Sequence, residues 1–232
     1  MSSREAFLQR VKSAVAEGNR AGAVPPLPDR SGIGYQGAGL DPVQRFCDEL
    51  AAAGGTAHIA ADSEAVFGTI QSVLQTHNAR RILLTSGGLI DELSVAGKLK
   101  SLGYDAKTIG DSSEVTRDEH FAADVGITNV HRLVAETGSV VLASKPSEPR
   151  FASLLPPVHI CLAERAQLLP DLFDLFDLFA PTASPIRSLP PSCLTLITGP
   201  SKTGDIELKL VTGVHGPGEI HVVLIESGER PA

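Results

Sequence analysis

Short apolar runs alternate with amphipathic stretches along most of the chain. Buried strands are predicted where aliphatic residues cluster between turn signals, as in Arg81 to Thr85 and Val140 to Ala143. Helices are predicted where apolar residues recur every three or four positions, as in the segment through Val66, Ile70 and Leu74. This alternation is typical of an α/β fold with an open, mainly parallel sheet that has helices on both faces.

Capping residues mark where the predicted helices begin. Asp41 before Pro42 starts one helix, Asp62 or Ser63 starts another, and a further helix begins near Thr116. The other predicted helices run from Ser86-Gly87-Gly88 through Leu89, Leu93, Ala96 and Leu99, from Gln167 to Phe179, and over the Ile206–Val211 stretch. The predicted strands are Thr56–Ala60, Arg81–Thr85, Tyr104–Ile109, Ala123–Thr128, Val140–Ala143, part of Leu154–Leu162, Leu194–Thr198 and Ile220–Ile225. Residues 129–135 are ambiguous between helix and strand.

Residues 1–40 differ from the rest of the chain. The capping-box spacing from Ser2 to Glu5 predicts an amphipathic helix that ends at Gly18, and a Pro/Gly-rich linker follows it. Within the linker, Gly32 to Gly37 has the spacing GxGxxG, but a proline-rich loop precedes it instead of a strand. We therefore exclude a dinucleotide site there. Residues 41–232 are predicted to form a single α/β domain.

Composition and charge narrow the function. The 232 residues are 42% hydrophobic with a net charge of −7, which supports a real core and argues against a nucleic-acid partner. No apolar run has the length of a membrane span and no secretory leader is seen, so we expect a cytoplasmic protein. The cysteines Cys47, Cys161 and Cys193 are isolated, and no His, Asp or Glu pattern has metal-ligand spacing. We therefore expect this chain to bind no metal and no iron–sulfur cluster.

The Asp-Leu-Phe triplet occurs three times within Gln167 to Phe179. A period of three drifts around a helix, so this helix would be apolar over most of its surface. Such a helix is expected to be buried or to contact another subunit. His159, a lone histidine within an apolar strand, is interpreted as a core residue.

Two glycine-rich turns near the end of the chain carry polar groups. A strand that breaks at Gly199-Pro200 and restarts as a helix would present free N–H groups to an anion, and Ser201, Lys202 and Thr203 would add hydroxyls and an ammonium. Asp205 would orient a neighbour or cap that helix. The second turn carries His215 and Gly216, and its glycines would expose the imidazole for proton transfer. The alternative is that these are ordinary connections whose polar residues cap a helix.

A polar turn earlier in the chain carries a second set of candidates. Glu136 lies between apolar segments just before Gly138, and such surroundings raise a carboxyl pKa and favour acid–base or nucleophilic work. The neighbouring Thr137, Gly138 and Ser139 are candidate ligand-binding residues. Arg150 is a candidate clamp for a carboxylate. The alternatives are an exposed or ion-paired glutamate and a solvated arginine.

Three blocks of the C-terminal half resemble the LutC/YkgG family, whose members carry the lactate-utilisation (LUD) domain. The blocks are Asp124–Thr128 with Ala135–Ser139, then Leu155–Ile160, then Thr198–Glu207 with Gly213–Pro217. The resemblance implies a fold similar to the NagB/RpiA/CoA-transferase-like group. It also implies a role in oxidising L-lactate to pyruvate, without NAD, as the cluster-free member of a set whose other members carry the iron–sulfur clusters.

On this basis we expect a subunit that binds a small carboxylate or phosphate-bearing ligand at the carboxyl ends of its strands. Glu136 and His215 would transfer protons, and Gly199 to Thr203 would hold the anion. One alternative is a stand-alone CoA transferase or sugar-phosphate isomerase with Glu136 as nucleophile or base. Another is a non-catalytic subunit that docks the iron–sulfur partners.

Overall fold

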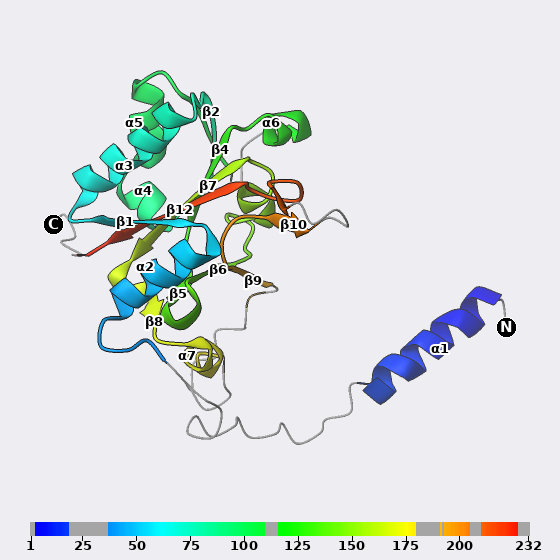
Figure 1. Cartoon of the computed structure of the whole chain (residues 1–232). Helices are drawn as coiled ribbons and strands as arrows, with labels where there is room; N and C mark the ends of the chain where they lie inside the picture. Colours follow the sequence, from blue (N-terminus) through cyan, green and yellow to red (C-terminus); the bar gives the residue numbers. More distant parts are fainter. Residues whose placement is uncertain are drawn as a thin grey trace. The chain divides into compact units, whose positions relative to one another are not determined.

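A six-stranded parallel sheet forms the centre of the structure (Figure 1). The computed structural model describes residues 3–18, 37–109, 116–179, 191, 193–204 and 210–226. The chain divides into two units, Met1–Tyr35 and Gln36–Ala232. The first unit contains helix α1 (Ser3–Gly18), which ends at the predicted glycine. The other helices and strands of the described residues belong to the second unit, and the predicted linker lies almost entirely outside the described residues.

The parallel sheet has its last strand in the interior. The strands in spatial order are β1 (Thr56–Ala60), β12 (Glu219–Ile225), β7 (Val158–Glu164), β4 (Val125–Asn129), β2 (Arg81–Leu84) and β3 (Asp105–Thr108). Each neighbouring pair runs parallel. The predicted open parallel sheet is therefore confirmed, and the C-terminal strand β12 joins the edge strand β1 to the rest.

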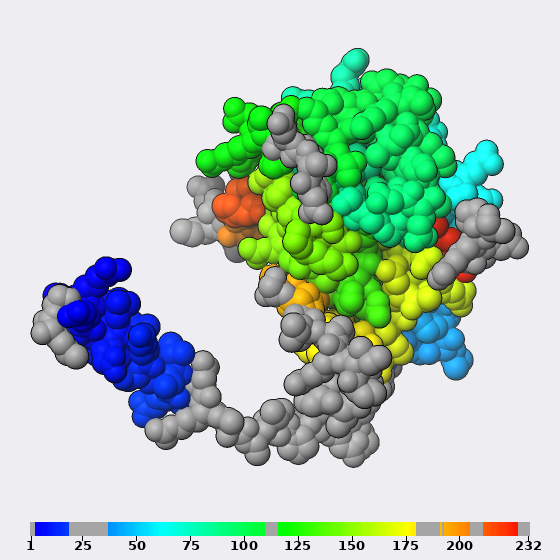
Figure 2. Space-filling model, turned by 180° about the vertical axis from the view of Figure 1, so that it is seen from behind, coloured from blue at the N-terminus to red at the C-terminus, as the bar shows by residue number. Residues whose placement is uncertain are grey.

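Helices cover both faces of this sheet, and the side-chain alternation along β12 shows which helix covers which face. Ile220, Val222 and Leu224 pack with the residues of α2 (Pro42–Ala53). Val223 and Ile225 point to the opposite face and pack with α3 (Ser63–Thr76). The short helices α4 (Gly88–Glu92) and α5 (Val95–Ser101) share this second face with α3. The space-filling view from behind shows mainly the green atoms of the segment from α5 to β6 (Figure 2).

The helix starts predicted at Asp41, Asp62 and Thr116 are confirmed by their caps. The Asp41 carboxylate accepts from the N–H groups of Val43 and Gln44, and the Asp62 carboxylate accepts from Ala65. Helix α6 (Arg117–Phe121) begins with a capping box, in which Thr116 and Glu119 bond each other's backbone N–H groups. The helix predicted from Leu89 to Leu99 is instead broken into α4 and α5, because Ser94 adopts a left-handed conformation with φ of +52°.

A second, smaller sheet was not predicted. Its strands in spatial order are β8 (Leu168–Leu169), β5 (Arg132–Val134), β6 (Ser139–Ala143) and β9 (Leu194–Ile197). Strand β5 runs parallel to β8 and antiparallel to β6, which in turn runs antiparallel to β9. Strand β9 is only half-buried, so the prediction of a buried strand there is wrong. The described residues also include the short 3-10 helices η2 (Ala135–Thr137), η3 (Arg150–Ser153) and η4 (Arg165–Gln167).

Two further predicted helices differ from the structure. The chain after Gly199 forms a hairpin of β10 (Lys202–Gly204) and β11 (Leu210–Thr212), so the helix predicted over Ile206–Val211 does not include its last two residues. Residues 205–209 lie outside the described residues. The helix predicted from Gln167 is only α7 (Leu172–Asp177), because Asp171 caps it by accepting from the Asp174 N–H. Among its residues Leu175 is buried whereas Phe176 is 53% exposed, so α7 is not buried on all sides.

Within the described residues, no helix combines the length and the apolar character that a membrane crossing requires.

Candidate functional site

The two glycine turns of the C-terminal region lie side by side and form a cleft. The Ser201 N–H donates to the Pro217 carbonyl at 2.8 Å, and the Gly213 N–H donates to the Ser201 carbonyl at 3.0 Å. The cleft has a volume of about 260 Å³. Four predicted site residues line it: Gly199, Ser201, His215 and Gly216. The structure thus brings these four together, and their role as ligand-binding or catalytic residues stays a prediction.

This cleft lies at the amino ends of the parallel strands, so we call it the amino-edge cleft. Gly218 immediately precedes β12, and its N–H donates to the carbonyl of Pro157, which immediately precedes β7. Loops that lead into parallel strands meet at the edge opposite the strand carboxyl ends. The prediction that Gly199 to Thr203 lie at the carboxyl ends is therefore wrong.

Lys202 contacts the end of helix α2. Its ammonium donates to the carbonyl oxygen of Ala53 at 2.5 Å. That carbonyl belongs to the last turn of α2, where the helix dipole is negative and the carbonyl groups have no intrahelical partner. Thr203 lies on β10 opposite Val211 and does not line the cleft. The helix that was predicted to follow does not include Leu210 and Val211, which lie on β11. Asp205 and the predicted start of that helix lie outside the described residues, and anion binding by this turn stays a prediction.

Gly138 and Gly199 are required by the close approach of α2. A Cβ at Gly138 would lie 2.3 Å from the Leu50 nitrogen, and one at Gly199 would lie 2.7 Å from the Ala53 oxygen. Both glycines also have positive φ, +61° and +86°. Packing against one helix therefore explains both glycines without a ligand.

Thr137 and Ser139 use their hydroxyls inside the protein. The Thr137 hydroxyl donates to Ser139 Oγ at 2.8 Å, and a second hydrogen bond joins Ser139 Oγ and Thr198 Oγ1 at 2.5 Å. Ser139 is only 2% exposed. This chain of hydroxyls ties the η2 turn to the end of β9 at the wall of the amino-edge cleft.

Glu136 and Arg150 do not join the other predicted residues. Glu136 is half-buried in the η2 turn, and its backbone N–H donates to the Pro170 carbonyl. The guanidinium of Arg150 has its Nη1 3.9 Å from Cys193 Sγ. Neither residue lines the amino-edge cleft. The structure therefore does not place Glu136 beside His215.

His159 is a core residue, as the sequence indicated. It is fully buried, and its Nε2 lies 2.9 Å from Thr128 Oγ1. Burial lowers the pKa of His159 to about 3, so the imidazole is neutral at physiological pH. Burial likewise raises the pKa of the neighbouring Cys161 thiol to about 12. His159 forms part of the apolar floor of the amino-edge cleft and brings no charge to it.

A second cleft of about 240 Å³ lies at the carboxyl ends of β2, β4 and β7, and we call it the carboxyl-edge cleft. After β2 the chain passes to β3 at the outer edge, whereas after β4 it leads toward β7 on the other side. The connections thus diverge between β2 and β4, which is where open α/β sheets bind ligands. Its lining residues are Gly88, Leu89, Glu92, Asn129, Val130, His131, Arg132, Lys145, Glu148, Leu162, Glu164 and Gln167.

Asn129 organises the floor of the carboxyl-edge cleft. Its Nδ2 donates to the Gly87 carbonyl at 2.7 Å, and its Oδ1 accepts from the Ile90 N–H at 3.2 Å. Gln167 donates to the Val130 carbonyl just beyond the end of β4. These amides fix the turn after β2 against the end of β4. The predicted turn Ser86-Gly87-Gly88 thus lies at a strand carboxyl end, as expected.

Arg132 and Lys145 bring two positive charges to the carboxyl-edge cleft. Burial lowers the pKa of His131, and the positive charges of Arg132 and Lys145 lower it further. Lys145 forms an ion pair with Glu148 at 3.3 Å, and Arg132 Nη1 donates to the His131 carbonyl at 2.6 Å. The guanidinium has further N–H donors that could bind a ligand. Nothing local in the sequence distinguishes Arg132; the divergence of the strand connections would have been the signal.

Comparison with known proteins identifies related chains over almost the full length. A family model described as the LUD domain matches residues 43–225. Lactate utilization protein C of Anoxybacillus flavithermus is 28% identical over 95% of this chain and 98% of its own. The protein of the same name from Bacillus subtilis is 26% identical over 97% of each chain. That of Halalkalibacterium halodurans is 32% identical over 68% of this chain and 67% of its own.

A solved structure has a similar fold. The crystal structure of a DUF162 family protein from Deinococcus radiodurans has a TM-score of 0.55 and 23% sequence identity, and it covers 79% of this chain and 96% of that chain. This likeness shows the fold alone.

Proposed function

The chain belongs to the LUD domain family, and from this premise we propose that it is a component of a lactate-utilisation system. The observation that carries the proposal is the near full-length match to proteins named Lactate utilization protein C, in which both chains are covered almost end to end. A match of that extent covers most of the second unit rather than one shared motif. Sequence similarity over that length is better evidence for a shared role than similarity of fold alone.

The proposed reaction is the oxidation of L-lactate to pyruvate. Lactate gives up two electrons and two protons, and the electrons pass to iron–sulfur clusters on partner proteins. The three cysteines of this chain are free, and Cys161 is fully buried, so a cluster site with four thiolates is not available here. The chain is therefore proposed as the cluster-free subunit.

The carboxyl-edge cleft is the proposed site for a small carboxylate. Arg132 would hold the carboxylate through its planar fork, and Lys145 would add a second positive charge. Glu148 is already paired with Lys145, and Glu164 accepts from the Gln167 N–H, so two of the three acidic side chains have partners. This assignment keeps the predicted ligand at the strand carboxyl ends but moves it to residues that the sequence did not select.

The proposed role in the cell is tested by deletion of the gene in its own host. Growth on L-lactate should be lost while growth on pyruvate continues, and the wild-type gene on a plasmid should restore growth. Normal growth of the deletion strain on L-lactate would overturn the proposed role.

The proposed ligand site is tested separately on the isolated protein. Thermal unfolding is measured with L-lactate, pyruvate, coenzyme A and inorganic phosphate for the wild type and for Arg132→Gln and Lys145→Gln. A carboxylate at 100 times its dissociation constant should add about 2.7 kcal/mol to the native state, and both variants should lose most of that gain. His215→Gln in the amino-edge cleft is the matched control and should keep it. A gain that His215→Gln abolishes and Arg132→Gln keeps would place the ligand in the amino-edge cleft instead.

The alternative of a stand-alone CoA transferase has less support. Glu136, the candidate nucleophile, lines neither cleft. A covalent nucleophile must reach the substrate, so its position favours the lactate-utilisation role.

A further inference from the structure

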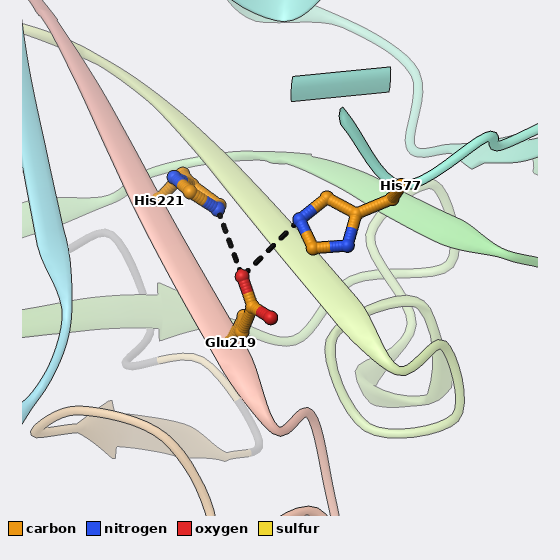
Figure 3. A group of neighbouring side chains, drawn as sticks. All are labelled: His77, Glu219 and His221. Carbon is orange, nitrogen blue, oxygen red and sulfur yellow. Dashed lines mark ion pairs between the residues drawn. The ribbon is translucent and has the colours of Figure 1, made fainter. Parts of the chain in front are cut away.

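Three potential metal ligands gather near the amino end of β12 (Figure 3). Glu219 and His221 lie on β12, and His77 is the residue that caps the C-terminus of α3. Glu219 Oε2 is 3.1 Å from His77 Nε2 and 3.7 Å from His221 Nε2. All three ligand atoms lie within 4.8 Å of one another. Two imidazoles therefore converge on one carboxylate oxygen.

The strand geometry explains this convergence. Residues two apart on a strand point to the same face, so Glu219 and His221 share the face of β12 that Val223 and Ile225 bury against α3. The end of α3 brings His77 to the same place. Ile220 points to the opposite face, toward α2 and the amino-edge cleft. The cluster is thus separate from both clefts.

A third histidine, outside the cluster, orients His221. His58 on β1 has its Nε2 3.1 Å from His221 Nδ1, and the two rings are stacked. One proton joins these nitrogens, and when His221 Nδ1 carries it, His221 Nε2 keeps its lone pair free for a ligand bond. His221 Nε2 is buried and has no hydrogen-bond partner among the described residues. A metal-binding histidine typically has this arrangement, with one nitrogen fixed by a neighbour and the other facing the ion.

We propose that His77, Glu219 and His221 bind a divalent first-row transition-metal ion of the zinc type. Ligands at about 2.0–2.1 Å from a tetrahedral ion lie roughly 3.3 Å apart, close to the two separations from Glu219 Oε2. Two imidazoles and one carboxylate form a donor set that suits zinc and its neighbours, whereas calcium and magnesium prefer oxygen ligands alone. The Glu219 side chain is 56% exposed, so the remaining coordination position faces water.

A simple ion pair between protonated His77 and Glu219 explains less of the structure. It satisfies His77 and Glu219 at 3.1 Å but leaves the buried His221 Nε2 without a hydrogen bond, because Glu219 Oε2 is 3.7 Å away. A buried imidazole nitrogen without a hydrogen bond destabilises the folded state. A shared ion would satisfy all three side chains and would tie the end of α3 to the start of β12.

Zinc binding to the full chain, prepared without a histidine tag, tests the proposal. Isothermal titration with Zn²⁺ should give one ion per chain, and titration with Co²⁺ should give the visible absorption of a low-coordinate nitrogen and oxygen site. His77→Gln and Glu219→Gln should each weaken binding at least tenfold. Glu219→Gln changes an exposed side chain and should fold normally, which keeps the test valid if His77→Gln unfolds the protein.

The controls separate this site from adventitious binding. His215→Gln removes an exposed histidine elsewhere, and Cys47→Ser with Cys193→Ser removes the partly exposed thiols; these variants should bind zinc as the wild type does. His58→Phe removes the partner of His221 Nδ1 and should weaken binding about tenfold. Absence of one-to-one binding, or a loss of less than tenfold in both His77→Gln and Glu219→Gln, would overturn the proposal.

Discussion

The ammonium of Lys202 donates a hydrogen bond to the carbonyl oxygen of Ala53, which lies 149 residues earlier in the chain. The sequence presents Lys202 as an anion ligand within a polar glycine turn. The structure shows that it closes the end of α2, with Pro200 and Gly54 packed beside it. This contact joins α2 to the β10–β11 hairpin, which lies between the two turns that line the amino-edge cleft.

Lys202→Ala should lower the free energy of unfolding by about 0.5–1 kcal/mol, because α2 loses a cation at its negative end and one carbonyl loses its partner. Urea unfolding followed by circular dichroism measures this. Lys12→Ala, an exposed change on α1, should stay within about 0.5 kcal/mol of the wild type. Unchanged stability of Lys202→Ala combined with loss of all ligand binding would contradict the structural role.

Gly138→Ala should destabilise the protein by roughly 2–4 kcal/mol. The new methyl group would meet the backbone of Leu50 at 2.3 Å, and the φ of +61° disfavours any side chain. Gly97→Ala in α5 is the matched control, since a Cβ there meets no atom within 4 Å. It should be neutral or stabilise by about 0.4–1 kcal/mol. Equal unfolding midpoints for the two variants would refute the close approach of α2.

His159 should make stability fall as the pH decreases. Its pKa is lowered to about 3 in the folded protein, so the unfolded chain binds the proton first as the pH falls below about 6.5. Between pH 7.5 and pH 5 this group should remove about 2 kcal/mol of stability. His159→Gln should show a correspondingly shallower dependence of unfolding free energy on pH. Identical pH slopes for the two proteins would mean that His159 is not buried in its neutral form.

Cys161 should not react with thiol reagents in the folded state. It is fully buried and its pKa is raised to about 12 by desolvation, so the reactive thiolate is almost absent. Cys47 and Cys193 are partly exposed and should be modified first. Mass spectrometry after brief alkylation should therefore find Cys161 unmodified until denaturant is added. Early modification of Cys161 would contradict its position in the core.

Phe176→Asp should leave folding almost unchanged, within about 0.5 kcal/mol, because the ring is 53% exposed on α7. Leu175→Asp on the same helix should be strongly destabilising, because Leu175 is fully buried beside Val134 and Val141. If α7 docks the proposed iron–sulfur partners, Phe176→Asp should also reduce co-purification of the complex. Full assembly by this variant would exclude α7 as the docking helix.

Local chemistry determined most of the secondary structure. Asp41, Asp62 and Thr116 begin helices because each side chain bonds N–H groups within its own first turn, and no distant residue takes part in that bond. The strand–helix alternation likewise indicated the parallel sheet. The hairpin β10–β11 was mistaken for a helix because Leu210 and Val211 are compatible with either structure, and pairing with Lys202–Gly204 decided between them.

The family could also be recognised from the sequence, since the blocks that carry it are continuous in the chain. Those blocks lie within residues 43–225, the range that the LUD domain model matches. The turns with Gly199, Ser201, His215 and Gly216 do meet at one cleft. The edge of the sheet on which that cleft lies depends on where the loops enter β7 and β12, and the sequence contains no local sign of this.

The sequence by itself determined the helix starts, the parallel sheet and the family. Only the tertiary structure decided which polar residues have partners already. Lys202, Gly138 and Gly199 serve α2, whereas His77 meets Glu219 and His221 from a distant helix end. The physical reason is that capping and alternation act over a few residues, whereas a cleft or a metal site needs side chains that only the packing of helix on sheet brings together.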